Sequence, residues 1–393
     1  MIYLLVFLLL IILSFHYDIN GGKNGHAFWS YGVIVVFILI AGFRWRLGSD
    51  TPRYINTFYY ETPLLSDFLN KELPLKNILW SLLNSLVLTV GGKFFIVQII
   101  QSAFVNILYF KYINRHSRYV FTCLLLYFIW MYTNQNMETM KASMAIVVGL
   151  FGNDYILEKK WLKGYFLFFL ACLFHISAIV LIITPLIKNF RFNSKLIIIL
   201  FLAYILGNII QSIAGDYLAY LEFNEEIYER VEMYMDSDRY MSSRNLNFFI
   251  VNMLPFFIYS YFSYLYLSKN KVNEGLMKLV PFVIMGLIFL MFRLNVTLFY
   301  RYIYFYNIYF VIFYAEAIIV MIRRRYLIKN NTNIIGVLVL FLPMFLVMAK
   351  YNYSRREMYY PYSSVFNREI NEERESTYMN MALFYAVPNK NEY

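Results

Sequence analysis

Long apolar stretches recur along the whole chain, and short charged segments separate them. Many of these stretches approach the roughly 20 residues that an α-helix needs to cross a hydrocarbon core of about 30 Å. Because lipid offers no hydrogen-bond partners, a spanning chain must satisfy its backbone within helices or a closed barrel, and continuous apolar stretches favour helices. The sequence therefore predicts an all-α, polytopic integral membrane protein that forms one membrane domain over residues 1–393.

Six short segments between the apolar stretches indicate the orientation of the chain. They hold 17 of the 35 Lys and Arg residues but only 3 of the 24 Asp and Glu residues. The positive-inside rule places such segments together on the cytoplasmic face. The six segments are 16–26, 111–118, 158–163, 188–195, 269–278 and 323–329.

Segments on the same face must be joined by an even number of crossings, and two intervals do not satisfy this simply. Three apolar stretches lie between the first two basic segments, so we expect the most polar of them, 73–90, to be re-entrant or surface-bound. Residues 161–187 are expected to form a re-entrant hairpin with His175 near its turn. The result is about 10–12 transmembrane helices, with one or two re-entrant segments and both termini outside.

Three larger segments then face the extracytoplasmic side, namely 44–72, 215–245 and 350–393. The middle one has eight acidic and three basic residues. Its apolar residues recur at helical spacing, which predicts an amphipathic helix lying over the membrane domain. The alternative is a solvated acidic loop with one packed stripe.

Composition narrows the class of protein. With 60% hydrophobic and 15% charged residues, a soluble fold is excluded, and the net charge of +11 lies in the short loops rather than on a surface that would bind nucleic acid. Cys123 and Cys172 fall inside apolar stretches, which gives no support for a disulfide framework or a CxxC metal site. Motifs for nucleotide phosphates or catalytic metals are absent, so we expect neither metal nor cofactor.

The densest polar cluster runs from Arg44 to Tyr54 and also contains Arg46, Gly48 and Asp50. Arginine presents planar, permanently charged forks that suit phosphate, and glycine lets the backbone approach a ligand closely. These features favour a lipid pyrophosphate at the outer interface. The alternative is that the two arginines only extend from a helix end to the membrane surface.

A second cluster begins the apolar stretch 137–157, where Glu138 and Lys141 lie near the same outer face. A cation at this depth indicates a functional site. The alternative is an intrahelical ion pair between these two residues. Ala145 and Gly149 form a face of small residues that would let another helix approach closely.

Three further positions carry candidate chemistry. His175 would act as a general base or, alternatively, pack as a neutral ring against Ser177. Arg293 and Arg301 lie at the outer end of a late, tyrosine-rich stretch, where aromatic rings such as Tyr302 would stack on sugar rings.

At these positions the sequence resembles the EpsG family of Wzy-type polymerases, which join lipid-linked repeat units of O-antigens, capsules and exopolysaccharides. Arg44, Gly48, Asp50 and Tyr54 match the first family pattern. Lys141 and Ala142 stand where Arg and Gln are expected, whereas Ala145, His175 and Arg301 fit. The stretches that carry the resemblance are 43–54, 134–146, 155–180, 298–307 and PYSSVF at 361–366.

The resemblance implies glycosyl transfer on the outer face of a bacterial cytoplasmic membrane, with an undecaprenyl-pyrophosphate-linked oligosaccharide as substrate. Cations would stabilise the leaving pyrophosphate, a carboxylate or imidazole would deprotonate the acceptor hydroxyl, and tyrosines would contact sugars. The cations for pyrophosphate would be Arg44, Arg46, Lys141, Arg293 and Arg301. The candidate bases are Asp50, Glu138 and His175. The tyrosines that would contact sugars are Tyr54 and Tyr302. A chain-length regulator and a flippase of the same pathway are expected partners.

Two other functions would also require a cationic cavity on the outer face. One is a flippase for lipid-linked oligosaccharides, which would have pseudo-symmetric halves. The other is a different outer-face transferase, either an O-antigen ligase or a membrane acyltransferase.

Overall fold

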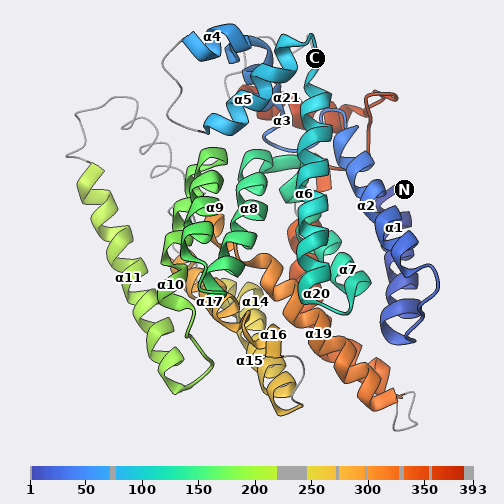
Figure 1. The fold of residues 1–393 in the computed structure, drawn as a ribbon, viewed down its shortest axis with the longest axis vertical. Coiled ribbons are helices and arrows are strands. Elements are labelled where there is room, and N and C mark those ends of the chain that lie inside the picture. Colours follow the sequence, from blue (N-terminus) through green and yellow to red (C-terminus); the bar gives the residue numbers. More distant parts are fainter. Residues whose placement is uncertain are drawn as a thin grey trace. The chain divides into compact units, whose positions relative to one another are not determined.

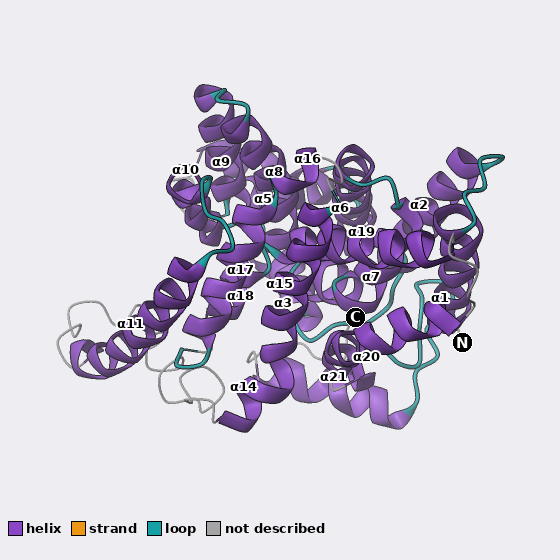
Figure 2. Cartoon of the chain, turned by 90° about the horizontal axis from the view of Figure 1, so that it is seen from below, coloured by secondary structure: helices purple, strands orange, loops and turns teal. Residues whose placement is uncertain are grey.

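A computed structural model describes residues 2–70, 77–218, 246–270, 274–296, 299–326, 332–353 and 356–384. Within these ranges the chain forms helices joined by loops (Figure 2), with one isolated antiparallel bridge between Arg44 and Ser364. The all-α prediction is therefore confirmed. The segment predicted as an amphipathic helix, 215–245, lies almost entirely outside the described residues.

Four helical segments of the described chain are long and apolar enough to cross a membrane. They are Ile2–Ile19, Phe94–His116, Ser194–Ser212 and Gly275–Arg293, and a pair of helices bent by 41°, Leu246–Asn252 and Leu254–Lys269, would make a fifth. The protein is thus an all-helical, multi-pass membrane protein. Several shorter apolar helices accompany these segments, and the larger number of 10–12 crossings stays a prediction.

The helices divide into two compact units, and the prediction of a single membrane domain stays a prediction. Unit 1 comprises Met1–Ile182, Ile319–Asn331 and Met348–Tyr393, and unit 2 comprises Ile183–Ile318 and Thr332–Val347. The complete helices of unit 1 are α1 (Ile2–Leu13), α2 (His26–Gly42), α3 (Thr51–Asn56), α4 (Leu65–Asn70), α5 (Ile78–Thr89), α6 (Phe94–His116), α7 (Val120–Trp130), α8 (Met140–Leu157), α9 (Trp161–Phe174) and α21 (Glu372–Phe384).

Unit 2 has seven complete helices among the described residues. They are α10 (Thr184–Ile187), α11 (Ser194–Leu218), α14 (Leu246–Asn252), α15 (Leu254–Lys269), α16 (Glu274–Met277), α17 (Val280–Arg293) and α18 (Tyr300–Ile303). Two longer helices, α19 (Asn307–Tyr326) and α20 (Thr332–Tyr353), contribute most of their length to it.

The chain reverses at His175, as predicted. Helices α8 and α9 approach so closely at Gly152 and Gly164 that a Cβ on Gly164 would lie 3.1 Å from the Gly152 carbonyl oxygen. A helix that continued in the same direction would carry Leu181 about 25 Å beyond Gly164. Instead the Leu181 side chain packs against Gly149, less than one turn from Gly152. Gly149 is one of the two small residues predicted to allow a close approach to α8.

Basic segments of unit 1 meet at one end of its helices. Arg323 Nε donates a hydrogen bond of 2.8 Å to the Asp18 carbonyl oxygen, and its guanidinium lies 5.2 Å from the centre of the Tyr119 ring. The Asp18 carboxylate in turn accepts hydrogen bonds from the amide and hydroxyl of Thr122, at 2.6 and 2.8 Å. Segments 16–26 and 323–329 are thereby joined to the start of α7.

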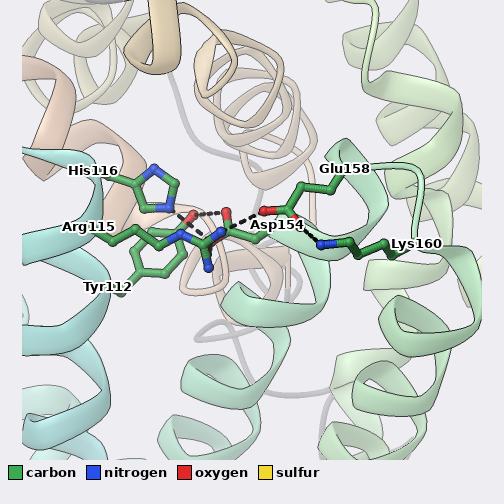
Figure 3. A network of polar contacts seen from close by, with 6 residues as sticks. All are labelled: Tyr112, Arg115, His116, Asp154, Glu158 and Lys160. Atoms are coloured by element: carbon green, nitrogen blue, oxygen red, sulfur yellow. Dashed lines mark hydrogen bonds and ion pairs between the residues drawn. The ribbon is translucent and has the colours of Figure 1, made fainter.

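An ion network ties α6 to the turn between α8 and α9 at the same end (Figure 3). The buried carboxylate of Asp154 lies 2.9 Å from His116 Nε2 and 3.3 Å from the Arg115 guanidinium. Arg115 also contacts Glu158 at 2.6 Å, and Lys160 contacts Glu158 at 2.7 Å. Four of the six basic segments therefore share one end of unit 1, which agrees with their predicted common face.

The opposite end of unit 1 carries the loop that follows α2. Tyr3, at the start of α1, packs its ring 4.8 Å from that of Tyr360, whereas Asp18 lies at the far end of the same helical segment. At about 1.5 Å per residue, this 18-residue segment separates the two ends by about 27 Å, close to the thickness of a hydrocarbon core. Figure 1 shows α3, α5 and α21 together at this end of α6.

Cysteine labelling will test this separation, because the exposed residues Arg53 and Lys163 lie at opposite ends of unit 1. In a background with Cys123 and Cys172 changed to Ser, we expect a membrane-impermeant maleimide to label Arg53→Cys in intact cells. Lys163→Cys should react only after permeabilisation. Labelling of both positions from the same side would contradict the arrangement.

Candidate functional site

The loop that follows α2 is fastened to a segment near the C-terminus. The Trp45 amide donates to the Ser363 carbonyl at 2.9 Å, and the Gly48 amide donates to the Met358 carbonyl at 3.1 Å. The Val365 amide donates back to the Phe43 carbonyl at 2.8 Å. We call residues 43–48 the outer loop. Two predicted outer segments, 44–72 and 350–393, are thus in direct contact.

Arg44 is buried beneath the outer loop, with 1% of its surface exposed. Its guanidinium donates to the carbonyls of Ala41 and Leu47 and lies 3.1 Å from the Met140 sulfur. Burial lowers the pKa of Arg44 to about 10, so that the side chain remains charged at neutral pH. The alternative of a side chain extending to the membrane surface is therefore wrong for Arg44, whereas its binding of pyrophosphate stays a prediction.

Arg46 adopts a positive φ of 49° and places its guanidinium 4.7 Å from the centre of the Tyr378 ring and 5.3 Å from that of Trp45. It is half-buried. Its stacking partner comes from α21, so the C-terminal helix covers one side of this cation.

A second buried arginine, Arg374 of α21, was not predicted from the sequence. Its guanidinium donates to the carbonyls of Arg46 and Glu357, and burial lowers the pKa of Arg374 to about 10. The buried face of α21 consists of Arg374, Tyr378 and Ala382, spaced four residues apart. This spacing was the available signal, because a basic residue in register with a packed stripe is unusual.

Gly48 allows the outer loop to lie directly on the segment that precedes α8. Its φ is +100°, and a Cβ at this position would collide with the Met137 carbonyl oxygen. Glycine was predicted here for a close approach of the backbone to a ligand. In the structure the close approach is to the chain itself.

Glu138 is buried, with 2% of its surface exposed, and two neutral donors satisfy its carboxylate. The Tyr359 hydroxyl donates to Oε1 at 2.5 Å, and the Asn134 amide donates to Oε2 at 3.0 Å. Tyr359 is the second residue that sequence reasoning missed. A buried carboxylate needs such partners, because an unpaired one would cost several kcal/mol.

Asp50 and Lys141 both lie close to Tyr54, which is buried. Lys141 Nζ is 6.0 Å from the centre of the Tyr54 ring, and the Lys141 backbone amide forms a hydrogen bond with the Tyr54 hydroxyl. Burial, and to a smaller extent the Asp50 carboxylate, raises the pKa of Tyr54 far above its usual value. Asp50 and Lys141 are partly exposed, and the neighbouring Arg53 is exposed. Both charge signs are therefore accessible here.

His175 follows the last residue of α9 and accepts a hydrogen bond on Nδ1 from the Ser177 amide at 3.2 Å. The Ser177 hydroxyl lies 2.6 Å from the same nitrogen. This geometry agrees with the packed histidine considered above, and the role of His175 as a base stays a prediction.

The remaining predicted residues belong to unit 2 and make their described contacts there. The Arg293 guanidinium lies 5.8 Å from the centre of the Phe248 ring, and Arg301 Nε donates to the Tyr300 hydroxyl at 3.4 Å. The Tyr302 ring packs 5.6 Å from that of Phe289. Each of these side chains therefore packs against an aromatic ring of unit 2.

No group of three or more metal-ligating side chains occurs in the described part of the chain. The arrangement in unit 1 offers instead cations and a carboxylate on a rigid support. Such a surface suits an anionic ligand bound through charge and hydrogen bonds.

A family model described as the EpsG family matches residues 27–364. No curated protein and no solved structure matches the chain. The matched range includes all the residues predicted for the site, and it ends before α21, so Arg374 and Tyr378 lie beyond it.

We expect Gly48→Ala to destabilise the protein by about 2–4 kcal/mol, because an alanine at positive φ is strained and its Cβ meets the Met137 carbonyl. Gly91→Ala is the matched control, since Gly91 also has a positive φ of 73° but open space around it. Strain alone should cost about 1 kcal/mol there. Thermal unfolding in detergent measures both, and equal losses would refute the close contact.

We expect Arg374→Gln to lower stability by about 1–3 kcal/mol, because it removes the buried donor that contacts the Arg46 carbonyl. Arg368→Gln serves as the control, since Arg368 is exposed and only stacks on Trp45 at 4.3 Å. Its loss should stay below about 1 kcal/mol. The same unfolding assay compares the two, and a larger effect at Arg368 would contradict the anchoring role of Arg374.

Proposed function

Because this chain belongs to the EpsG family, we propose that it acts in exopolysaccharide biosynthesis as a polymerase that joins lipid-pyrophosphate-linked oligosaccharide repeat units. The reaction would take place on the outer face of the cytoplasmic membrane. The observation that best supports this proposal is the pair of partly exposed charges Asp50 and Lys141 beside the buried Tyr54 ring, at the end of unit 1 opposite its basic segments.

Polymerisation moves a growing glycan from its lipid pyrophosphate onto a hydroxyl of the next lipid-linked unit. The hydroxyl oxygen attacks the anomeric carbon, the bond from that carbon to the phosphate oxygen breaks, and the lipid pyrophosphate leaves. The proton of the hydroxyl passes to a base. Negative charge therefore grows on the leaving pyrophosphate, and fixed cations beside it lower the barrier.

The accessible cations suit the leaving group. Lys141 and Arg46 are partly exposed, whereas Arg44 is buried and holds the loop that carries Arg46. We assign pyrophosphate contact to Lys141 and Arg46, with Arg44 as support. Arg293 and Arg301 remain proposed contacts from unit 2, and Tyr54 and Tyr302 remain proposed surfaces for sugar.

Among the three candidate bases, Asp50 is the one best placed to reach a substrate hydroxyl. Its carboxylate is partly exposed, and the Ser49 hydroxyl lies 3.4 Å from it. Glu138 is covered by Tyr359, and His175 binds Ser177 through Nδ1. We therefore propose that Asp50 takes the proton of the acceptor hydroxyl, as general-base catalysis requires a carboxylate within reach of substrate.

The direct experiment supplies purified protein in lipid vesicles with a synthetic undecaprenyl-pyrophosphate repeat unit. A polymerase yields a ladder of longer products. A flippase yields movement of the lipid across the vesicle without a ladder. A ligase or acyltransferase yields a single transfer to a different acceptor.

Within that assay we expect Lys141→Gln to reduce the rate of ladder formation about 100-fold, as removal of one donor to developing negative charge does. Lys93→Gln is the matched control, because Lys93 is an exposed lysine at the start of α6, at the same end of unit 1. It should leave the rate unchanged. A normal rate in Lys141→Gln, with equal protein in the vesicles, would remove Lys141 from the site.

A further inference from the structure

A groove lies between α2 and α6, in the turns next to the basic segments of unit 1. Its volume is about 240 Å³, and its walls come from one face of each helix. Since one water molecule occupies about 30 Å³ in the liquid, the groove admits a ligand several times larger than water. The lining residues are Tyr31, Ile34, Ile107, Phe110, Lys111, Asn114 and Arg115.

The polarity of this groove changes along α6. Ile107 and Phe110 form its apolar part, and Lys111, Asn114 and Arg115 follow within two turns towards the helix end. These polar residues are exposed, with Arg115 showing 46% of its side chain. On α2, Ile34 contributes to the apolar part, and Tyr31 packs its ring 5.3 Å from that of Phe110.

This gradient matches an amphipathic anion held at a membrane surface. The apolar part of the groove would hold an acyl chain within the bilayer. The cations at the rim of the groove would bind the phosphate. Basic pockets between transmembrane helices on the cytoplasmic side bind anionic head groups in this way. A soluble anion would use the cations but gain nothing from Ile34 and Ile107.

We propose that this groove is a binding site for an anionic phospholipid of the leaflet that the basic segments face. Lys111 supplies the main charge and Asn114 a neutral donor to the phosphate. Arg115 contributes its remaining guanidinium hydrogens, because it also contacts Asp154 and Glu158 (Figure 3). The bound head group would thereby touch the network that joins α6 to the turn after α8. This site is independent of the proposed polymerase activity.

The test compares dioleoyl-phosphatidylglycerol with dioleoyl-phosphatidylcholine, which carries the same chains without net charge. Native mass spectrometry of the full-length protein, loaded with an equal mixture of the two, counts the lipids retained. We expect phosphatidylglycerol to be retained in preference. Lys111→Gln should weaken its retention about fivefold, as one lysine near a membrane surface contributes that factor.

Two further variants separate the groove from general surface charge. Lys163→Gln removes an exposed lysine at the same end but outside the groove, and it should retain phosphatidylglycerol as the unaltered protein does. Ile107→Trp keeps every charge and fills the apolar part, and it should reduce retention of phosphatidylglycerol. Equal losses in Lys111→Gln and Lys163→Gln, or full retention in Ile107→Trp, would overturn the proposal. Displacement by inorganic phosphate at equal concentration would do so too, since it would show a site for free anions.

Discussion

A guanidinium buried at the end of a membrane bundle must find its acceptors within the protein, because neither lipid nor water is there to supply them. Arg44 and Arg374 donate hydrogen bonds to backbone carbonyls in and beside the same short loop. The carbonyls are thereby fixed in position, and the shape of the outer loop follows from them. Gly48 completes the arrangement, since only glycine lets the loop rest on the Met137 carbonyl.

The buried arginines divide the polar residues of this end into a supporting layer and an accessible layer. Glu138, satisfied by Tyr359 and Asn134, belongs to the support, together with Arg44. Asp50 and Lys141 retain access to solvent. Under the proposed function, this supporting layer would hold the accessible charges in position, so that they need no reorganisation when the reaction occurs.

Hydropathy and charge predicted the features that depend on local pattern. The lengths of the apolar stretches predicted the all-helical class. The requirement for an even number of crossings between basic segments predicted the reversal at His175 and the common end of four basic segments. The structure confirms these three features for its described part. The contact partners of Arg374 and Tyr359 could not be predicted, because they come from distant parts of the chain. Only the spacing on α21 indicated that Arg374 lies on its packed face. Arg44 was predicted to belong to the polar cluster at the end of the second apolar stretch. An arginine at a helix end gives no sign of whether a loop and the C-terminal segment will bury it.

The contact between the outer loop and the C-terminal segment has a consequence for biosynthesis. Trp45 and Ser363 are 318 residues apart in the chain. At about 5–20 residues per second, a ribosome needs roughly 15–60 seconds to synthesise the stretch between them. During that time the outer loop lacks the C-terminal segment that it contacts in the finished protein, while the intervening helices are inserted. The candidate site is therefore finished only at the end of translation, so that a prematurely terminated chain lacks it even when its first helices are correctly inserted.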